Sequence, residues 1–429
     1  MRAPILAKAS GKAAHGQSRG RCQYGVMARD ADILIVGGGL NGPALALALA
    51  RAGFSVVIVD ARAPGVRAGA GFDGRAYALS VASKRLLEAV GVWPGLADKA
   101  QPILQIKASD GLAGAGGSPF FLQFDHAEIE EGPMGFMVED RHLYAAFLSA
   151  LADDRITLIS GETVVAQEVG AVAQVTLGSG RVLSAQVLIG CDGRGSGVAA
   201  RAGIRRQGWG YGQVALVTAV HHAGDHHGTA HQYFMPGGPL AILPLAGGHH
   251  SSIVWSEAEG VARDIQALGD ADYLAALRPR FGDFLGEVAL AGDRFSYPLS
   301  LSLAEIWVSD RLALVGDAAH GVHPIAGQGL NLGLRDVAAL AEVVTEAAQR
   351  GEDIGTRAVL ARYERWRRFD TTALALGMDA VNRLFSNDNP VLRAGRDLGL
   401  GLVSALPGVR RRFIRQAAGL SGNVPKLMR

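Results

Sequence analysis

Cysteine and aromatic residues are scarce in this chain of 429 residues. Its two cysteines, Cys22 and Cys191, are too few for the disulfide framework of a small secreted protein, so we expect a reducing, cytoplasmic setting. Aromatic residues make up only 6% of the chain, whereas 58 residues are glycine. We interpret this balance, with its abundant alanine and arginine, as a bacterial coding bias rather than a structural signal.

An excess of charge and a long apolar run are also missing. The 42 basic and 40 acidic side chains nearly cancel, which gives no reason to expect a nucleic-acid partner. No run reaches the roughly 20 apolar residues of a membrane-spanning helix, and residues 44–50 are typical of a core helix. Apolar residues make up 49% of the chain, enough for a packed core in two domains or one elaborated α/β domain.

The charge is uneven only at the start of the chain. The first 29 residues contain six Lys or Arg and no Asp or Glu. They lack the apolar segment of a secretory signal, although their composition also fits an organelle transit peptide. We predict that residues 1–29 form a disordered tail or come from an over-extended gene start, because Met27 stands just before the first expected strand.

A glycine-rich segment joins an expected strand to an expected helix. Residues 33–36 read ILIV, a run typical of a strand buried on both faces. The spacing GxGxxG follows at Gly37, Gly39 and Gly42, and an alanine- and leucine-rich helix comes next. A second strand ends in Asp60, about 20 residues past the glycines, where a carboxylate can accept ribose hydroxyl groups. The unit predicts a dinucleotide site, with a pyrophosphate at the helix N-terminus, but does not distinguish NAD from FAD.

Two later strands each lead into a loop with a solitary carboxylate. Residues 187–190 read VLIG and precede Cys191-Asp192-Gly193, a DG turn. Residues 312–315 read LALV and precede Gly316-Asp317, a GD turn. The GD turn leads into HPIAGQGLNLGLRD, residues 323–336, which has more proline and closely spaced glycine than a plain turn needs.

The order GxGxxG, DG turn, GD turn resembles that of the class A flavoprotein aromatic hydroxylases, which use FAD. Residues 323–336 resemble more closely still the signature of the ubiquinone-biosynthesis hydroxylases of the UbiH and UbiF type. Further matches lie at residues 73–80, 238–245 and 395–400, and the resemblance covers residues 31–420.

The resemblance implies an α/β fold. It comprises a Rossmann-like FAD-binding domain of the GR2 type, as in p-hydroxybenzoate hydroxylase, an antiparallel-sheet substrate domain and C-terminal helices. The expected segments are 30–105, 140–205 and 302–350 for the FAD-binding domain, 106–139 and 206–301 for the substrate domain, and 351–429 for the helical region. Alternating apolar and polar positions between residues 206 and 301 independently favour an antiparallel sheet, whose flavin-facing wall we expect to include Leu243 and Pro244.

The resemblance also implies which residues meet the flavin. The expected FAD-binding residues are Gly37, Gly39, Gly42, Asp60, Arg75, Arg141, Asp192, Gly316, Asp317, Gly327 and Gln328. Asp317 would accept a hydrogen bond from the ribityl chain, the alternative being a helix cap or a turn acid. Arg75 would contact FAD, the alternative being a surface arginine. Pro324, Gly329, Leu330 and Asn331 are the expected catalytic residues, because backbone N–H groups at a helix start favour the negative charge of reduced flavin.

Four features depart from this pattern or are left over. The chain has Asp60 where the family usually has Glu, and Ala199 where an arginine commonly follows the DG turn. Five histidines, at positions 221, 222, 226, 227 and 231, crowd one segment, for which we expect a solvated loop rather than a metal site. The segment VRRRFIR, residues 409–415, fits either a membrane-surface helix or a solvated charged helix.

The sequence therefore predicts an FAD-dependent monooxygenase that uses NAD(P)H and O2 to hydroxylate a polyprenylated phenol of ubiquinone biosynthesis. A flavin hydroxylase of another aromatic substrate, or a non-catalytic flavin-binding subunit of a biosynthetic complex, remains open. The tryptophan-rich WxWxIP element of flavin halogenases is absent. Peripheral attachment at the inner face of the membrane is an open alternative to a free cytoplasmic protein.

Overall fold

A computed structural model describes residues 29–66, 71–112, 114, 116–322, 327–385 and 406–429. Residues 1–28 of the predicted tail, the expected catalytic Pro324 and the matched segment 395–400 lie outside these described residues. Among the described residues, no helix has both the length and the apolar character that crossing a bilayer requires.

The first large sheet has six strands in the order β19-β20-β12-β1-β2-β8. Their bounds are β1 Ile33–Val36, β2 Val56–Asp60, β8 Ile156–Ser160, β12 Val187–Gly190, β19 Val308–Ser309 and β20 Leu312–Leu314. All neighbours pair in parallel except β19 and β20. The apolar runs that predicted β1, β2, β12 and β20 are confirmed as strands, and these four are buried almost throughout, as a sheet covered on both faces requires.

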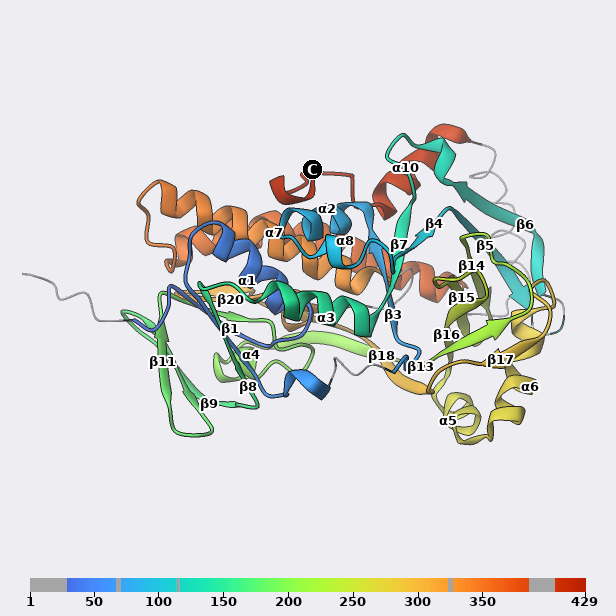
Figure 1. Ribbon diagram of the computed structural model, residues 1–429, viewed down its shortest axis with the longest axis horizontal. Coiled ribbons are helices and arrows are strands. Elements are labelled where there is room, and N and C mark those ends of the chain that lie inside the picture. The colour runs from blue at the N-terminus through green and yellow to red at the C-terminus, as the bar shows by residue number, and fades with distance from the viewer. Residues whose placement is uncertain (1–28, 67–70, 113, 115, 323–326, 386–405) are drawn as a thin grey trace, which may run out of the picture.

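Helices cover one face of this sheet and a small sheet covers the other (Figure 1). Helix α1 (Asn41–Arg51) packs against α7 (Gln328–Gln349), and α8 (Arg357–Phe385) runs along α7. On the other face lie β9 (Val164–Val169), β10 (Ala173–Leu177) and β11 (Val182–Ala185), whose inward side chains join the same core. Short helices α3 (Asp140–Ala150) and α4 (Gly197–Arg201) complete this half.

The second large sheet has the order β21-β18-β13-β16-β15-β14-β5-β6, with β17 beside β13. Its strands are β5 Gln105–Leu112, β6 Gly116–Asp125, β13 Arg206–His222, β14 Thr229–Met235, β15 Gly238–Pro244, β16 His250–Ala258, β17 Val288–Leu290, β18 Phe295–Ala304 and β21 His320–Gly321. The predicted antiparallel pairing is confirmed from β13 to β16, but β14 pairs with β5 in parallel. The domain boundaries given above stay a prediction.

Side chains alternate between the two faces of this sheet, as the pleat of a strand requires. On one face, Leu240, Ile242 and Trp255 pack against α5 (Glu259–Ala267) and α6 (Asp270–Phe281) in what we call the outer apolar cluster. The other face adjoins a second group of apolar side chains, which we call the inner apolar cluster. Its buried members are Ile103, Met134, Met137, Ala219, Ala230, Leu245 and Ile414, and its partly buried members are Phe72, Ala76, Ala78, Ile106, Phe124, Ile129, Leu243 and Ala291.

A third sheet, β3-β7-β4, connects the two halves. Its strands are β3 Ala76–Ser80, β7 Gly135–Glu139 and β4 Gln101–Ile103. Strand β3 leads directly into α2 (Val81–Ala89), which Ser80 caps by accepting a hydrogen bond from the backbone N–H of Ser83 at 3.1 Å. Ala76 and Ala78 of this sheet belong to the inner apolar cluster, so the sheet borders the substrate-side face.

Candidate functional site

The three predicted loops meet at the carboxyl edge of the parallel sheet. Gly37 follows β1, Asp192 follows β12, Gly316 follows β20, and Asp60 ends β2. A Cβ atom on Gly37 would lie 2.3 Å from the carbonyl oxygen of Cys191, so the GxGxxG and DG loops touch. Ligands of open α/β sheets bind at this edge, beyond the ends of the strands.

The GxGxxG segment, residues 37–42, forms what we call the glycine turn, and it allows close approach of another group. A Cβ atom on Gly42 would lie 1.9 Å from the carbonyl oxygen of Gly37, and one on Gly38 would lie 2.3 Å from Oδ2 of Asp60. Gly37 also has a positive φ of 111°. The first turn of α1 has no acidic residue, and no side chain caps it. A tight turn, an uncapped helix N-terminus and a neighbouring carboxylate fit the pyrophosphate and ribose of a dinucleotide such as FAD.

Asp192 organises the DG turn. Its Oδ1 accepts a hydrogen bond from the hydroxyl of Ser196 at 2.6 Å, and its Oδ2 accepts one from the backbone N–H of Val198 at 3.0 Å. Ser196 in turn accepts a hydrogen bond from the N–H of Ala199, the first turn of α4. Asp192 therefore fixes the loop that touches Gly37, and Ala199 is buried in the core rather than facing a ligand.

Two arginines hold the GD turn. Nε of Arg194, from the DG turn, lies 3.1 Å from Oδ2 of Asp317, and its Nη2 donates to the carbonyl of Val322 at 3.2 Å. Arg206, at the start of β13, donates to the carbonyls of Asp317 (3.0 Å) and Ala318. Burial lowers the pKa of Arg206, and the nearby Asp317 carboxylate opposes that shift. The carboxylate of Asp317 stays 36% exposed and accessible to a ligand hydroxyl.

A fully buried ionic network lies beneath the GD turn. Asp336 of α7 accepts hydrogen bonds from Nε of Arg367 (3.0 Å), from the backbone N–H of Gly316 (3.2 Å) and from Nε2 of His320, if that nitrogen is protonated. The side chains of His320, Asp336 and Arg367 are 0% exposed. Burial alone would raise the pKa of Asp336, but His320 and Arg367 outweigh burial and lower it. The network ties α7 and α8 to both ends of the GD turn.

The N-terminus of α7 faces the third sheet. Gly327 precedes the helix with φ of 63°, and no side chain caps the first turn. Asn331 accepts hydrogen bonds from Ser80 and Ser83 at 2.8 Å each and donates to the carbonyl of Ala78 at 2.8 Å. Because the Asn331 side chain is used in these contacts, only its backbone remains for a ligand. The helix begins at Gln328, so that Gly329, Leu330 and Asn331 lie in its first turn.

Arg75 and Arg141 lie at the paired ends of β3 and β7. Nη2 of Arg75 lies 2.6 Å from Oδ2 of Asp73 and 3.5 Å from Oδ2 of Asp140, and its guanidinium stacks over the ring of Phe295 at 5.3 Å. Burial opposes ionisation of Asp73, but its hydrogen bonds with Arg75 outweigh burial and lower its pKa. Arg141 instead pairs with Glu139 at 2.6 Å.

The inner apolar cluster adjoins the start of α7. Ala78 belongs to this cluster, and its carbonyl accepts a hydrogen bond from the side chain of Asn331. A Cβ atom added to Gly327 would lie 3.0 Å from the Cβ of Ala78. Leu243 is a partly buried member of the same cluster, whereas Pro244 is buried. Apolar side chains therefore line the side of the sheet nearest the uncapped helix.

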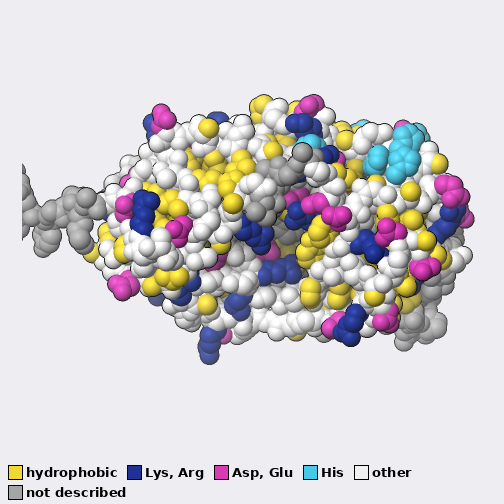
Figure 2. Space-filling model, turned by 60° about the horizontal axis from the view of Figure 1, so that its bottom comes forward, with side chains coloured by type: hydrophobic (Ala, Val, Ile, Leu, Met, Phe, Trp, Pro, Cys, Tyr) yellow, Lys and Arg dark blue, Asp and Glu magenta, His cyan; other side chains and the backbone are white. Residues whose placement is uncertain are grey.

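The histidine segment is not the solvated loop that we expected. His222 and His226 are buried, and their ring nitrogens bond to backbone and hydroxyl groups, including the carbonyls of Gly224 and Leu245. Ring contacts join the exposed His221 to His249 and His250, and histidines form a patch toward one end of the face in Figure 2. Among the described residues, no three His, Cys, Asp or Glu side chains are arranged to hold a metal ion. Tertiary packing thus buries part of a segment whose local sequence looks polar.

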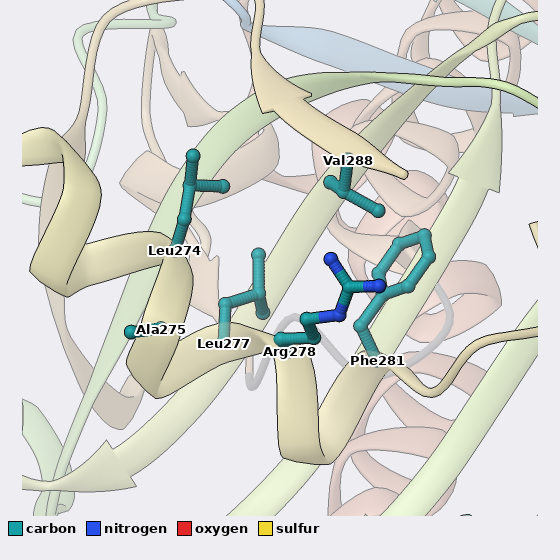
Figure 3. A pocket seen from close by; sticks show the side chains of 6 residues that line it. All are labelled: Leu274, Ala275, Leu277, Arg278, Phe281 and Val288. Carbon is teal, nitrogen blue, oxygen red and sulfur yellow. The ribbon is translucent and has the colours of Figure 1, made fainter. Parts of the chain in front are cut away.

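A small pocket lies on the opposite side of the second sheet from the three loops. It has a volume of about 200 Å³ and is lined by Leu274, Ala275, Leu277, Arg278, Phe281 and Val288 (Figure 3). Leu277, Phe281 and Val288 belong to the outer apolar cluster, and Arg278 pairs with Glu287 at 2.8 Å. The pocket is therefore separate from the predicted cofactor and substrate residues.

Sequence reasoning missed several residues that shape the site. Arg194, Arg206, His320, Arg367 and Asn41 were not singled out. Asn41 lies between two glycines, since a Cβ atom would come within 2.2 Å of its Nδ2 at Gly316 and 2.4 Å at Gly333. The only local signal was the position of Arg194 directly after the DG turn. Arg206, Arg367 and Asn41 contact segments far away in the chain, which no spacing rule reveals.

Known proteins resemble this chain in sequence and in fold. The chain is 45% identical to the ubiquinone hydroxylase UbiL of Rhodospirillum rubrum over 93% of its own length and 92% of that protein. It is 36% identical to the 3-demethoxyubiquinol 3-hydroxylase of Escherichia coli over 91% and 98% of the two chains. The crystal structure of p-nitrophenol 4-monooxygenase PnpA from Pseudomonas putida superposes with a TM-score of 0.74 at 20% identity, covering 91% and 98% of the chains, and shows the same fold.

The family of the FAD binding domain matches residues 30–374. This span contains the glycine turn, the DG turn, the GD turn and all of α7. The predicted cofactor FAD and the predicted α/β fold with an antiparallel sheet are therefore confirmed. The chain belongs to the FAD binding domain family and is an FAD-dependent monooxygenase.

Proposed function

We propose that the protein hydroxylates a polyprenylated phenol intermediate of ubiquinone biosynthesis, with NAD(P)H and O2 as co-substrates. The observation that carries the proposal is the convergence of the three FAD loops beside the inner apolar cluster. The curated relatives are ubiquinone hydroxylases, which supports a ubiquinone intermediate as the substrate.

The cofactor would lie along the carboxyl edge of the parallel sheet. Gly37, Gly39 and Gly42 would accommodate its pyrophosphate, with Asp192 setting the adjoining loop. Asp60 would accept hydrogen bonds from the ribose, and Asp317 from the ribityl chain, with Gly316 allowing the turn through its φ of 62°. When bound, FAD takes electrons from NAD(P)H and activates O2, so that one oxygen atom enters the ring and the other leaves as water.

The chain's own groups would then set the electrostatics and keep water out. Gly327, Gln328 and Gly329 would let the backbone approach the flat ring of the flavin. The N–H groups of Leu330 and Asn331 would favour negative charge at its pyrimidine edge. Pro324 would stiffen the preceding loop, and Leu243 would form part of the apolar wall that excludes water from the substrate ring. Arg75 and Arg141 would supply polar contacts to the cofactor.

We further propose that the protein works in the cytoplasm, attached peripherally to the inner face of the membrane or to a biosynthetic complex. A polyprenylated substrate is held by the bilayer, and the enzyme must reach it there.

Mass spectrometry of quinone-pathway lipids in cells that lack the gene tests the substrate. We expect a prenylated phenol that is short of one oxygen atom to accumulate, and fragmentation will locate the missing hydroxyl. Re-expressing the wild type should restore the ubiquinone pool, whereas Asp317→Ala should not. An unchanged pool in cells with no redundant hydroxylase would overturn the substrate assignment. NADH oxidation by the purified protein with a phenol would separately exclude a non-catalytic subunit.

A further inference from the structure

Helix α10 (Pro407–Ala417) presents large apolar side chains to solvent. Leu406, directly before the helix, is 45% exposed, Val409 is 38% exposed and Phe413 is 52% exposed. Spacings of three, four and seven residues place these side chains on one face. A continuous apolar stripe of this kind on an outer helix indicates a surface that meets a partner.

Basic side chains surround this stripe. The helix contains four arginines and no acid, although the whole chain carries a net charge of only +2. Arg410 pairs with Glu128 at 3.0 Å and Arg415 pairs with Glu131 at 2.8 Å. Arg411 and Arg412 are exposed and have no ion-pair partner within the described part of the chain. Arg412 flanks the stripe, whereas Arg411 is two residues from both Val409 and Phe413 and lies on the other side of the helix. An unneutralised Arg412 beside exposed apolar groups complements an anionic, partly apolar surface.

The opposite side of the same helix enters the protein. Ile414 is 2% exposed and is a member of the inner apolar cluster, together with Leu243 and Met137. Figure 1 shows α10 at the edge of the second sheet, near β6 and β7. One helix therefore has its outer face in solvent and its inner face in the cluster that adjoins the start of α7.

We propose that α10 docks the protein on the surface of a bilayer that contains anionic lipids. Val409 and Phe413 enter the interface between head groups and acyl chains, and Arg412 lies beside lipid phosphates. The lipid tail of a bilayer-held substrate then meets the protein next to Ile414 and the inner apolar cluster. This last step rests on the proposed function, whereas the docking itself does not.

Flotation of the full-length, FAD-loaded protein with lipid vesicles tests the proposal. We expect binding to phosphatidylcholine vesicles that contain about 30% phosphatidylglycerol, and binding at least about tenfold weaker to phosphatidylcholine alone. Raising NaCl to about 0.5 M should release most of the protein, because salt screens the arginines. Val409→Glu and Phe413→Glu should each weaken binding about tenfold. Val165→Glu, at a position 58% exposed on β9, is the matched control and should bind like the wild type.

Further readouts separate the outcomes. Thermal unfolding and flavin absorbance should be the same in all variants, since Val409 and Phe413 support neither the core nor the cofactor site. NADH oxidation with a phenol that has no prenyl tail should be unchanged in the α10 variants, and its absence in the wild type would refute the proposed function without touching the docking. Absence of wild-type binding to anionic vesicles, or equal binding by the α10 variants, would overturn the docking. Dimers that dissociate on Phe413→Glu, seen by light scattering, would overturn it in favour of a protein interface.

Discussion

Replacing Asp336 by asparagine tests the buried network under the GD turn. The substitution preserves the shape of the side chain but removes the negative charge beside Arg367, which stays fully buried. Removing one partner of a buried ion pair costs about 3–5 kcal/mol. Asp370 remains 3.3 Å from Nη1 of Arg367 and offers partial compensation from a half-exposed position. We therefore expect the free energy of unfolding to fall by about 3 kcal/mol, the lower end of that range.

Urea unfolding near neutral pH, followed by circular dichroism, measures this change. Arg263→Gln is the control, since Arg263 and Glu259 form an ion pair at 3.3 Å with side chains 74% and 63% exposed. Its loss should cost less than about 1 kcal/mol. If Asp336→Asn costs no more than this control, the buried network does not stabilise the fold and the reasoning is wrong.

The same network has a pH signature with a defined sign. His320 and Arg367 hold the pKa of Asp336 below its ordinary value of 3.8. A lowered carboxyl pKa stabilises the fold above the ordinary value, and this stabilisation is lost as the pH falls from there toward the folded-state pKa. The wild type should therefore lose more stability than Asp336→Asn when the pH is lowered below about 4. Parallel pH profiles for the two proteins would contradict this.

Three other changes give sharp expectations. Asp317→Ala should purify with little FAD, as judged by flavin absorbance, and a fully yellow variant would refute the ribityl contact. Gly42→Ala should lose FAD and stability, because its Cβ would lie 1.9 Å from the carbonyl of Gly37, whereas Gly260→Ala, with open space around it in helix α5, should lose neither. Burial lowers the pKa of His231 to about 4 from 6.5, so the fold should lose stability as the pH falls from 6.5 toward 4. His231→Phe should flatten the unfolding profile in that window, and an unchanged profile would count against the burial of a neutral imidazole.

The sequence by itself determined the local units of this protein. Apolar runs such as residues 33–36 and 187–190 predicted strands buried on both faces. The glycine spacing predicted a turn that needs a positive φ and close approach of the backbone. These signals are readable because they depend on neighbours within a few residues. The resemblance of the order GxGxxG, DG turn, GD turn to that of the class A flavoprotein hydroxylases then distinguished FAD from NAD, and the family match confirmed it.

The histidine segment shows where local reading fails. Its doublets and glycines look like a solvated turn, yet His222 lies at 0% exposure in β13 and bonds to Ser251 across the sheet. Burial of the His222 ring is possible because both of its nitrogens have partners, one the nearby carbonyl of Gly224 and the other the distant hydroxyl of Ser251. No pattern within the segment predicts the distant partner.

Only the tertiary structure decided how the loops are held together. The GD turn leaves the parallel sheet after β20 and joins the second sheet through β21, which pairs with β18. Arg206 anchors that turn from 111 residues away, and Asn331 reaches Ser80 across 251 residues. Such partners are chosen by which strand ends become neighbours when the sheets form and by which buried charges must be neutralised. Both follow from the packing of the whole chain. The sequence therefore predicted the loops, and only the tertiary structure determined which side chains hold them in position.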